Sequence, residues 1–324
     1  MTTPKTSARG VELTAIDTDG HRHVCRLIVH GKHIKYAVVY DDDFGVKPPG
    51  KLTNYSGDIP FPIPPGGDWR VKQIVKDEQT EQPKFVDPKT EDQTALRPRG
   101  ARNAGHPTRI DYFDEDLETV RRGIKGVEVI GRNDQLRLVT HPALAGGKKP
   151  VLMKTIDFPF PRERHYLEVE TQAYRVLAGQ DITPEFLGHV TAEGLVIGFF
   201  LEWVDAGTGG YNRSEHPGLE DERRCLDAVD RLHSLGIVHG DLHSGNMLWR
   251  TGRASEYPGI IFIDFETAKF TEDPSAREKD IDRLVRRWHG DWSLGIDDVH
   301  LEDLHLGDST SSIDVETFIS VVAG

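Results

Sequence analysis

Two short segments in the last third of the chain constrain its fold more than any other feature. Residues 238–248 read VHGDLHSGNML, and residues 260–266 read IIFIDFE. Each starts with apolar residues that suit a short buried strand, and polar side chains follow where that strand would end. We therefore expect Asp241 and Asn246 on one loop, and Asp264 after the next strand, to face a common cleft. Carboxylate and amide oxygens are hard ligands that suit Mg²⁺, an ion that also binds substrate phosphates.

Composition excludes several broad classes. The chain has 324 residues, 37% of them hydrophobic, and a formal net charge of −13. No apolar run approaches the roughly 20 residues that span a bilayer, and no secretory signal is readable at the N-terminus. A general nucleic-acid binder would normally be basic, so the charge does not indicate an anionic partner. Cys25 and Cys225 lie in separate apolar segments without metal-ligand spacing. We therefore expect a reducing compartment, the cytoplasm, and no membrane partner.

The first 110 residues predict strands and loops rather than helices. Residues 11–40 alternate apolar and polar side chains around a turn at residues 30–33, as a β-hairpin does. Ten prolines follow before residue 108, so this stretch cannot sustain a helix. Within it, residues 69–75 suit one more strand, and we expect residues 87–105 to be exposed.

From about residue 110 the pattern becomes that of a packed domain in which short apolar strands accompany amphipathic helices. The predicted helices are residues 113–122, 162–177 and 219–235, and the predicted strands are residues 127–130, 135–140, 150–156, 186–190 and 195–203.

Between residues 118 and 290 the chain resembles the protein-kinase-like superfamily. His239-Gly240-Asp241 with Asn246 is similar to the catalytic loop of that superfamily, and Asp264-Phe265-Glu266 stands where its metal-binding DFG would be. The resemblance implies that Asp241 is the catalytic base and that Asn246 and Asp264 bind Mg²⁺. His243 stands where many kinases carry Lys or Arg, which makes it a candidate contact for a phosphate or the substrate.

Upstream motifs extend the resemblance to nucleotide binding. Residues 151–154 read VLMK, similar to the third-strand motif whose lysine, here Lys154, holds the α- and β-phosphates of ATP. Glu170 in the following helix stands at the place of the glutamate that pairs with this lysine; Glu168 is the alternative, and the acid that does not pair would be a surface charge. Three residues lie where the adenine-reading hinge should be: Glu202, Trp203 and Val204.

The resemblance implies an α+β, two-lobed kinase-like fold. A small, antiparallel, β-rich N-lobe would span about residues 118–203, and a helical C-lobe about residues 205–324. The kinase-like domain would begin at residue 111 and follow an N-terminal β-hairpin and proline-rich extension over residues 1–110. We expect that extension to pack on the domain, because apolar side chains such as Trp69 need burial.

Departures from the signalling-kinase pattern narrow the resemblance. Gly240 replaces the usual arginine, Glu266 replaces the DFG glycine, and the hairpin over residues 127–140 has no GxGxxG. In these features the chain resembles aminoglycoside, choline and other small-molecule phosphotransferases more than signalling kinases. Residues 182–202 also resemble fungal kinase-like proteins that are often encoded near secondary-metabolite genes.

Three functions follow as hypotheses. The first is an ATP- and Mg²⁺-dependent phosphotransferase acting on a small molecule. The second is another transfer reaction on a kinase-like scaffold, such as nucleotidyl transfer or a tRNA-dependent arginine-type cyclodipeptide synthase; the N-terminal extension motivates it, and the net acidity argues mildly against tRNA. The third is a pseudokinase binding module, which the retention of Asp241, Asn246 and Asp264 argues against. The acidic residues 271–324 leave both a cationic acceptor and a solvent-facing role open, and the sequence does not determine the oligomeric state.

Overall fold

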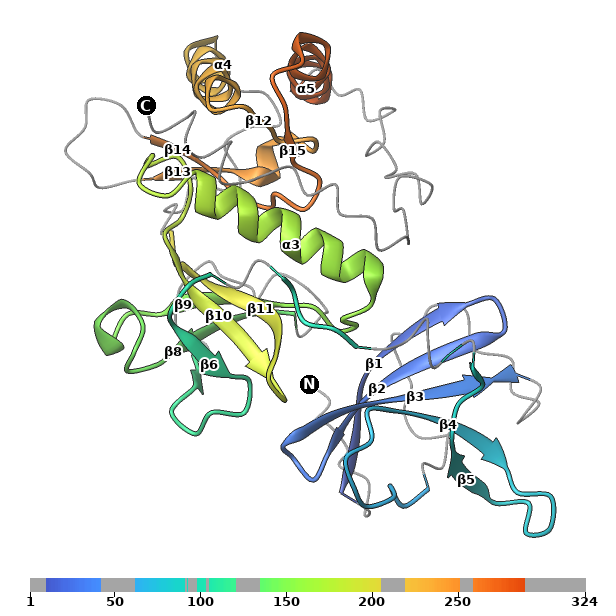
Figure 1. The fold of residues 1–324 in the computed structure, drawn as a ribbon. Helices are drawn as coiled ribbons and strands as arrows, with labels where there is room; N and C mark the ends of the chain where they lie inside the picture. The colour runs from blue at the N-terminus through green and yellow to red at the C-terminus, as the bar shows by residue number, and fades with distance from the viewer. Residues whose placement is uncertain are drawn as a thin grey trace.

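The computed structural model describes residues 10–41, 62–90, 92, 98–102, 105–120, 135–204, 219–250 and 259–288. It has a mixed α+β architecture in which two larger sheets lie side by side and helices accompany the second of them (Figure 1). No helix in the described part of the chain is long and apolar enough to cross a membrane.

The N-terminal sheet has five strands in the order β1-β2-β3-β4-β5. Its strands are β1 (Val11–Asp19), β2 (Arg22–Val29), β3 (His33–Tyr40), β4 (Val71–Lys76) and β5 (Pro83–Val86). The alternation read from the sequence is confirmed, because Cys25 and Leu27 belong to one apolar cluster and Val24 to another. Successive side chains of a strand point to opposite faces, so this sheet buries apolar residues on both.

The second sheet has six strands in the order β6-β10-β11-β9-β8-β7. Its strands are β6 (Arg109–Asp111), β7 (Glu118–Thr119), β8 (Leu136–Thr140), β9 (Val151–Thr155), β10 (Phe186–Ala192) and β11 (Leu195–Glu202). The neighbouring strands are antiparallel except β6, which pairs with β10 in parallel.

Apolar residues cover both faces of this second sheet. Helix α3 (Pro161–Val176) packs on one face, where the rings of Tyr174 and Phe199 lie 5.7 Å apart. Side chains of the opposite face, such as Met153, share a cluster with Tyr36 of the N-terminal sheet. The Tyr36 hydroxyl also donates a hydrogen bond to the Asp157 carbonyl at 3.1 Å. The N-terminal sheet therefore packs directly against the body that carries the candidate site.

The C-terminal part combines helices with two pairs of short strands. Its elements are α4 (Leu219–Ser234), β12 (Ile237–Val238), β13 (Met247–Arg250), β14 (Gly259–Phe262), β15 (Lys269–Phe270) and α5 (Pro274–Trp288). β12 pairs with β15 and β13 with β14, both antiparallel. Leu232, Phe262 and Leu284 bring α4, β14 and α5 into the same apolar cluster as α3.

Most predicted elements are confirmed to within a few residues at their ends. The predicted helix over residues 113–122 is wrong in its described part, which forms turns and strand β7. The Asp111 carboxylate accepts the Phe113 backbone N–H and the Asp114 carboxylate accepts the Asp116 backbone N–H, both at 2.9 Å. Such side-chain bonds offer the backbone an alternative to helical hydrogen bonding.

Two stretches differ from the predictions or lie outside the described residues. Residues 87–105 are not uniformly exposed, because Asp92 and Ala101 are buried. The Ala101 backbone N–H donates to the Val196 carbonyl at 3.1 Å, which holds this stretch against β11. The predicted strand at residues 127–130, and the turn where a glycine-rich loop was sought, lie outside the described residues.

Candidate active site

The β13–β14 hairpin brings the predicted metal-binding residues together. Asn246 directly precedes β13 and Asp264 follows β14 by two residues, and the strand register pairs Met247 with Phe262. The Ile263 backbone N–H donates to the Asn246 carbonyl at 3.0 Å, which extends the pairing toward the site. The buried Asn246 side chain donates through Nδ2 to the Asp241 carbonyl at 2.9 Å. The hairpin therefore ties the loop that carries Asp241 to the segment that carries Asp264.

The backbone of this loop explains why a glycine stands at position 240. Gly240 has a φ of 83°, in the left-handed region that favours glycine. A Cβ atom there would press against the Thr267 carbonyl oxygen, and the Thr267 hydroxyl donates to the His239 carbonyl at 3.2 Å. An arginine at position 240 would therefore clash with this turn. His239 has a bracing role, because its Nε2 lies 2.9 Å from the Ile263 carbonyl oxygen.

Asp280 of α5 organises the loop, and the sequence analysis missed it. Its fully buried carboxylate accepts the backbone N–H groups of His239 at 2.9 Å and Gly240 at 3.0 Å. The same carboxylate lies 3.0 Å from Nε2 of His233. The sequence pattern could have revealed it: Asp280 lies one helical turn before the apolar Leu284 and therefore on the same, buried face of α5. Buried acids require partners, so this position indicated a structural contact.

We expect Asp280→Asn to lower the free energy of unfolding by about 3 kcal/mol, because the two backbone N–H groups bind different carboxylate oxygens and an amide has only one oxygen to accept them. Urea unfolding of the whole chain measures this change. The control is Asp282→Asn, which removes only an exposed ion pair with Arg286 on the same helix and is expected to cost under about 0.5 kcal/mol. Equal losses in the two variants would contradict the assigned role of Asp280.

A second unpredicted residue, Arg287, holds the Asp241 carboxylate. Arg287 of α5 donates through one terminal guanidinium nitrogen to Asp241 Oδ1 at 2.8 Å and to the Leu242 carbonyl at 3.3 Å. His243 Nε2 lies 3.6 Å from Asp241 Oδ2. Burial alone would raise the pKa of Asp241, but the nearby His243 and the hydrogen bond from Arg287 lower it well below its usual range. Asp241 is therefore a carboxylate at neutral pH with a fixed orientation.

Lys154 is the centre of a four-residue ionic cluster. Its Nζ lies 2.7 Å from Glu170 Oε2, 2.7 Å from Asp264 Oδ1 and 2.8 Å from Glu266 Oε1. Burial alone would lower the pKa of Lys154, but attraction to these three carboxylates raises it well above its ordinary value. Lys154 is therefore charged, and it joins β9, α3 and the segment after β14.

The structure decides between the two candidate partners of Lys154. Glu170 makes the contact, whereas Glu168 accepts hydrogen bonds from the Arg102 backbone N–H at 2.8 Å and from its guanidinium at 3.0 Å. Glu168 is buried, so its predicted role as a surface charge is wrong. The reason is tertiary, because residues 98–102 run beside α3 and supply the cation.

Among the described contacts, none joins the predicted hinge residues to Lys154 or to its acidic partners. Glu202 closes β11, and its carboxylate binds the Arg250 guanidinium at 2.8 Å. Val204 is buried and Trp203 is half-buried. The Glu202 carboxylate is thus bound to β13.

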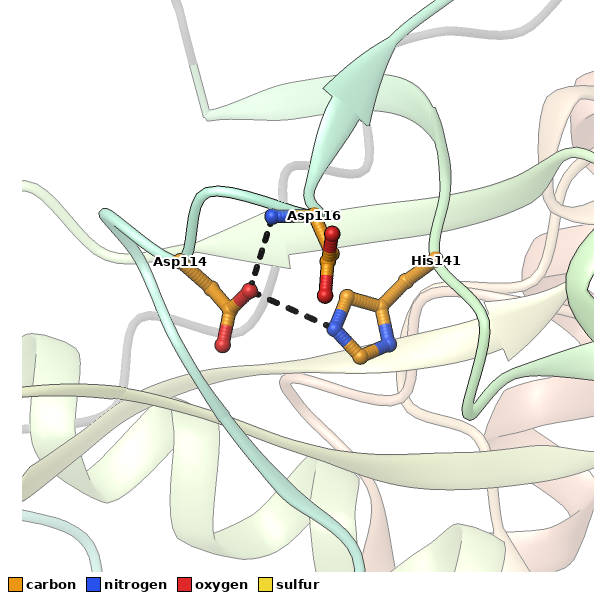
Figure 2. A group of neighbouring side chains, drawn as sticks. All are labelled: Asp114, Asp116 and His141. Carbon is orange, nitrogen blue, oxygen red and sulfur yellow. Dashed lines mark hydrogen bonds and ion pairs between the residues drawn. The ribbon is translucent and has the colours of Figure 1, made fainter.

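A separate group of possible metal ligands lies at the edge of the second sheet. Asp114, Asp116 and His141 place one ligand atom each within 4.8 Å of one another (Figure 2). His141 Nδ1 accepts the Ala143 backbone N–H at 3.1 Å, so the proton of a neutral ring resides on Nε2, which faces Asp114 at 3.5 Å. In this tautomer Nε2 carries a proton and offers no lone pair to a metal, so the contact with Asp114 joins two turns and does not form a metal site.

Comparison with known proteins supports a kinase-like assignment. The Lipopolysaccharide kinase (Kdo/WaaP) family matches residues 222–319, less than a third of the chain, in the region that contains Asp241, Asn246 and Asp264. The chain is also 40% identical over 58 residues to the KEOPS complex subunit Bud32 of Pyrococcus abyssi, which covers 18% of this chain and 24% of the relative.

Another relative is a probable bifunctional tRNA threonylcarbamoyladenosine biosynthesis protein of Methanothermobacter thermautotrophicus, 34% identical over 70 residues, which cover 21% of this chain and 12% of the relative. The chain therefore matches a quarter or less of the length of these curated relatives. Together the matches support a protein of the kinase-like superfamily and a kinase-like transferase.

Proposed function

We propose that this protein is an ATP- and Mg²⁺-dependent phosphotransferase acting on a small molecule. The observation that carries the proposal is the Lys154 cluster, in which one ammonium bonds Glu170 of α3 and Asp264 after β14, both at 2.7 Å. Glu170 and Asp264 lie 16 and 110 residues from Lys154 along the chain. Kinases use such an assembly to hold ATP phosphates beside a metal-binding aspartate.

The donor set suits Mg²⁺. Asn246 uses its Nδ2 on the Asp241 carbonyl, which leaves its side-chain oxygen as a ligand, and the Asp264 side chain is 45% exposed. Both are hard oxygen donors of the kind that Mg²⁺ prefers. When bound, the ion would neutralise developing charge on the transferred phosphoryl group. Asn246 and Asp264 would hold it.

The acceptor hydroxyl would bind at Asp241. Arg287 occupies Oδ1 of this carboxylate, so the acceptor would approach Oδ2, beside His243. As the hydroxyl oxygen bonds to phosphorus and the bond to ADP breaks, the hydroxyl proton passes to Asp241. The low pKa of Asp241 suits orientation of the hydroxyl and late proton transfer more than early deprotonation. Catalysis is then mostly positioning and charge neutralisation.

The remaining assignments form part of the same proposal. Residues 111–324 would form the two-lobed kinase-like domain, with the β-rich lobe over 118–203 and the helical lobe over 205–324, preceded by the extension over 1–110. The backbone of residues 202–204 would meet the adenine base. We further propose that the protein acts in fungal secondary metabolism and that it is cytoplasmic.

A second candidate is a tRNA-linked transfer reaction on the same scaffold. Two relatives, from Methanothermobacter thermautotrophicus and Methanoculleus marisnigri, are described as probable bifunctional tRNA threonylcarbamoyladenosine biosynthesis proteins, and this favours the candidate over other non-kinase reactions. The net charge of −13 weighs against it.

The test is nucleotide binding followed by acceptor screening. We expect calorimetric titration of the full chain with ADP and Mg²⁺ to give saturable binding. Incubation with ATP, Mg²⁺ and a metabolite mixture should then yield products one phosphoryl group heavier than an acceptor, detected by mass spectrometry. Chelation of the metal with EDTA should abolish them. The absence of nucleotide binding together with the absence of phosphorylated products would contradict the proposal.

A further inference from the structure

Glu266 stands where the superfamily pattern has a glycine, and its side chain reaches the same ammonium as the two expected acids. The Glu266 carboxylate lies 2.8 Å from Lys154 Nζ. The ligand atoms of Glu170, Asp264 and Glu266 all lie within 4.8 Å of one another. A glycine could make no such contact, so this feature separates the chain from the signalling-kinase pattern.

The backbone around Glu266 is held on both sides, so its side chain is directed by the fold. Phe265 is fully buried, with its ring 5.5 Å from that of Tyr174 and 4.8 Å from that of His239. On the other side, Thr267 is bonded to the His239 carbonyl. The contact with Lys154 therefore belongs to an anchored turn rather than to a freely moving loop.

Three carboxylates gather at the Lys154 ammonium, where a phosphate would bind. Nζ donates hydrogen bonds to Glu170 and Asp264, and the Glu266 carboxylate lies 2.8 Å from it as an ion pair. A nucleotide phosphate must therefore displace one of them. Glu170 is the least able to leave, because its side chain is only 2% exposed and it also accepts the Tyr174 hydroxyl at 3.3 Å. Asp264 and Glu266 are 45% and 39% exposed and can turn toward solvent or a cation.

Charge makes the displacement depend on a cation. The acidic groups outnumber the single ammonium, so the cluster carries an excess of negative charge where an anionic phosphate would bind. Like charges a few ångströms apart repel strongly at the effective dielectric constant of a partly buried site. A divalent cation offsets that excess, whereas a metal-free nucleotide meets the full repulsion.

We propose that Glu266 competes with the nucleotide phosphates for Lys154 and thereby makes nucleotide binding depend on a divalent cation. The inference rests on the proposed function, since it assumes that a nucleotide binds at Lys154. It assigns Glu266 a specificity-determining role that the glycine of the superfamily pattern could not have.

The experiment is calorimetric titration of the full-length chain with ADP, once in EDTA and once with Mg²⁺. In EDTA we expect Glu266→Gln to bind ADP at least about tenfold more tightly than wild type. With Mg²⁺ the two proteins should differ by less than about threefold, because the cation already offsets the charge. Glu266→Gly, which introduces the glycine of the superfamily pattern, should change binding in the same direction. Glu272→Gln, an exposed acid nearby in the sequence, is the matched control and should behave as wild type.

The outcomes separate this inference from the proposed function. Equal affinities of wild type, Glu266→Gln and Glu266→Gly in EDTA, with normal binding in Mg²⁺, would overturn the competition and leave the phosphotransferase proposal standing. Failure of every variant to bind ADP under either condition would overturn both. Binding by the Glu266 variants but not by wild type in EDTA would support the competition most strongly.

Discussion

Asp264→Asn is expected to reduce ATP turnover by at least about a thousandfold, an effect of roughly 4 kcal/mol on the activation barrier. The substitution removes a negative charge from the proposed Mg²⁺ site and from an ion pair with Lys154 at 2.7 Å. It leaves the backbone conformation accessible, because Asp264 has a φ of 66° and asparagine tolerates the left-handed region well. Turnover should therefore be lost without loss of the fold.

The measurement is ADP release in the presence of ATP and Mg²⁺, with urea unfolding in parallel. We expect the free energy of unfolding to change by less than about 1 kcal/mol, because the Asp264 side chain is 45% exposed. Asp282→Asn, which alters an exposed acid on α5, should retain full turnover. Near-normal turnover in folded Asp264→Asn would remove the phosphotransferase proposal.

Lys154→Met is expected to lower the rate of phosphoryl transfer by roughly 10²–10³, because one preorganised charge contact contributes about 2–4 kcal/mol to transition-state stabilisation. Methionine preserves an unbranched apolar stem on β9 but leaves Glu170, Asp264 and Glu266 without their shared cation. Lys154→Arg should not restore the rate, because the planar guanidinium of arginine cannot reproduce the compact ammonium that contacts all three acids in the wild type. Lys269→Met, at an exposed lysine of β15, is the control.

The same variant distinguishes the two candidate functions. Product formation by wild type and by Lys154→Met is compared with and without ATP. In a phosphotransferase, omission of ATP abolishes the product of both proteins. A reaction that proceeds without ATP and still requires Lys154 would exclude the kinase reaction and favour the tRNA-linked alternative, in which the lysine meets another anionic group.

Local patterns in the sequence were sufficient for most of the elements around the site. The period-two alternation of residues 11–40 predicted two strands around a turn at residues 30–33, and the structure divides the first of them into β1 and β2. Helical spacing predicted α3 to within one residue at each end. The apolar residues before Asp264 predicted β14. These features depend on side chains within a few residues of one another, and so periodicity reveals them.

Local patterns failed where two kinds of local bonding compete. The acidic residues between 111 and 116 were compatible with the start of a helix, but their side chains bind nearby backbone N–H groups and form turns instead. Both outcomes use the same residues at the same spacing. The competition depends on the strand pairing of β6 and β7 on either side, which the sequence does not display.

The sequence by itself determined which chemical groups this protein places at its site: a lysine after an apolar run, acids on the next helix, and the Asp241, Asn246 and Asp264 constellation. Only the tertiary structure decided which of them meet. It selected Glu170 over Glu168, added Asp280 and Arg287 from α5, and brought Glu266 to Lys154. The physical reason is that charged groups far apart in the chain become partners only when packing places them within a few ångströms, where the ion pair can offset the cost of burial.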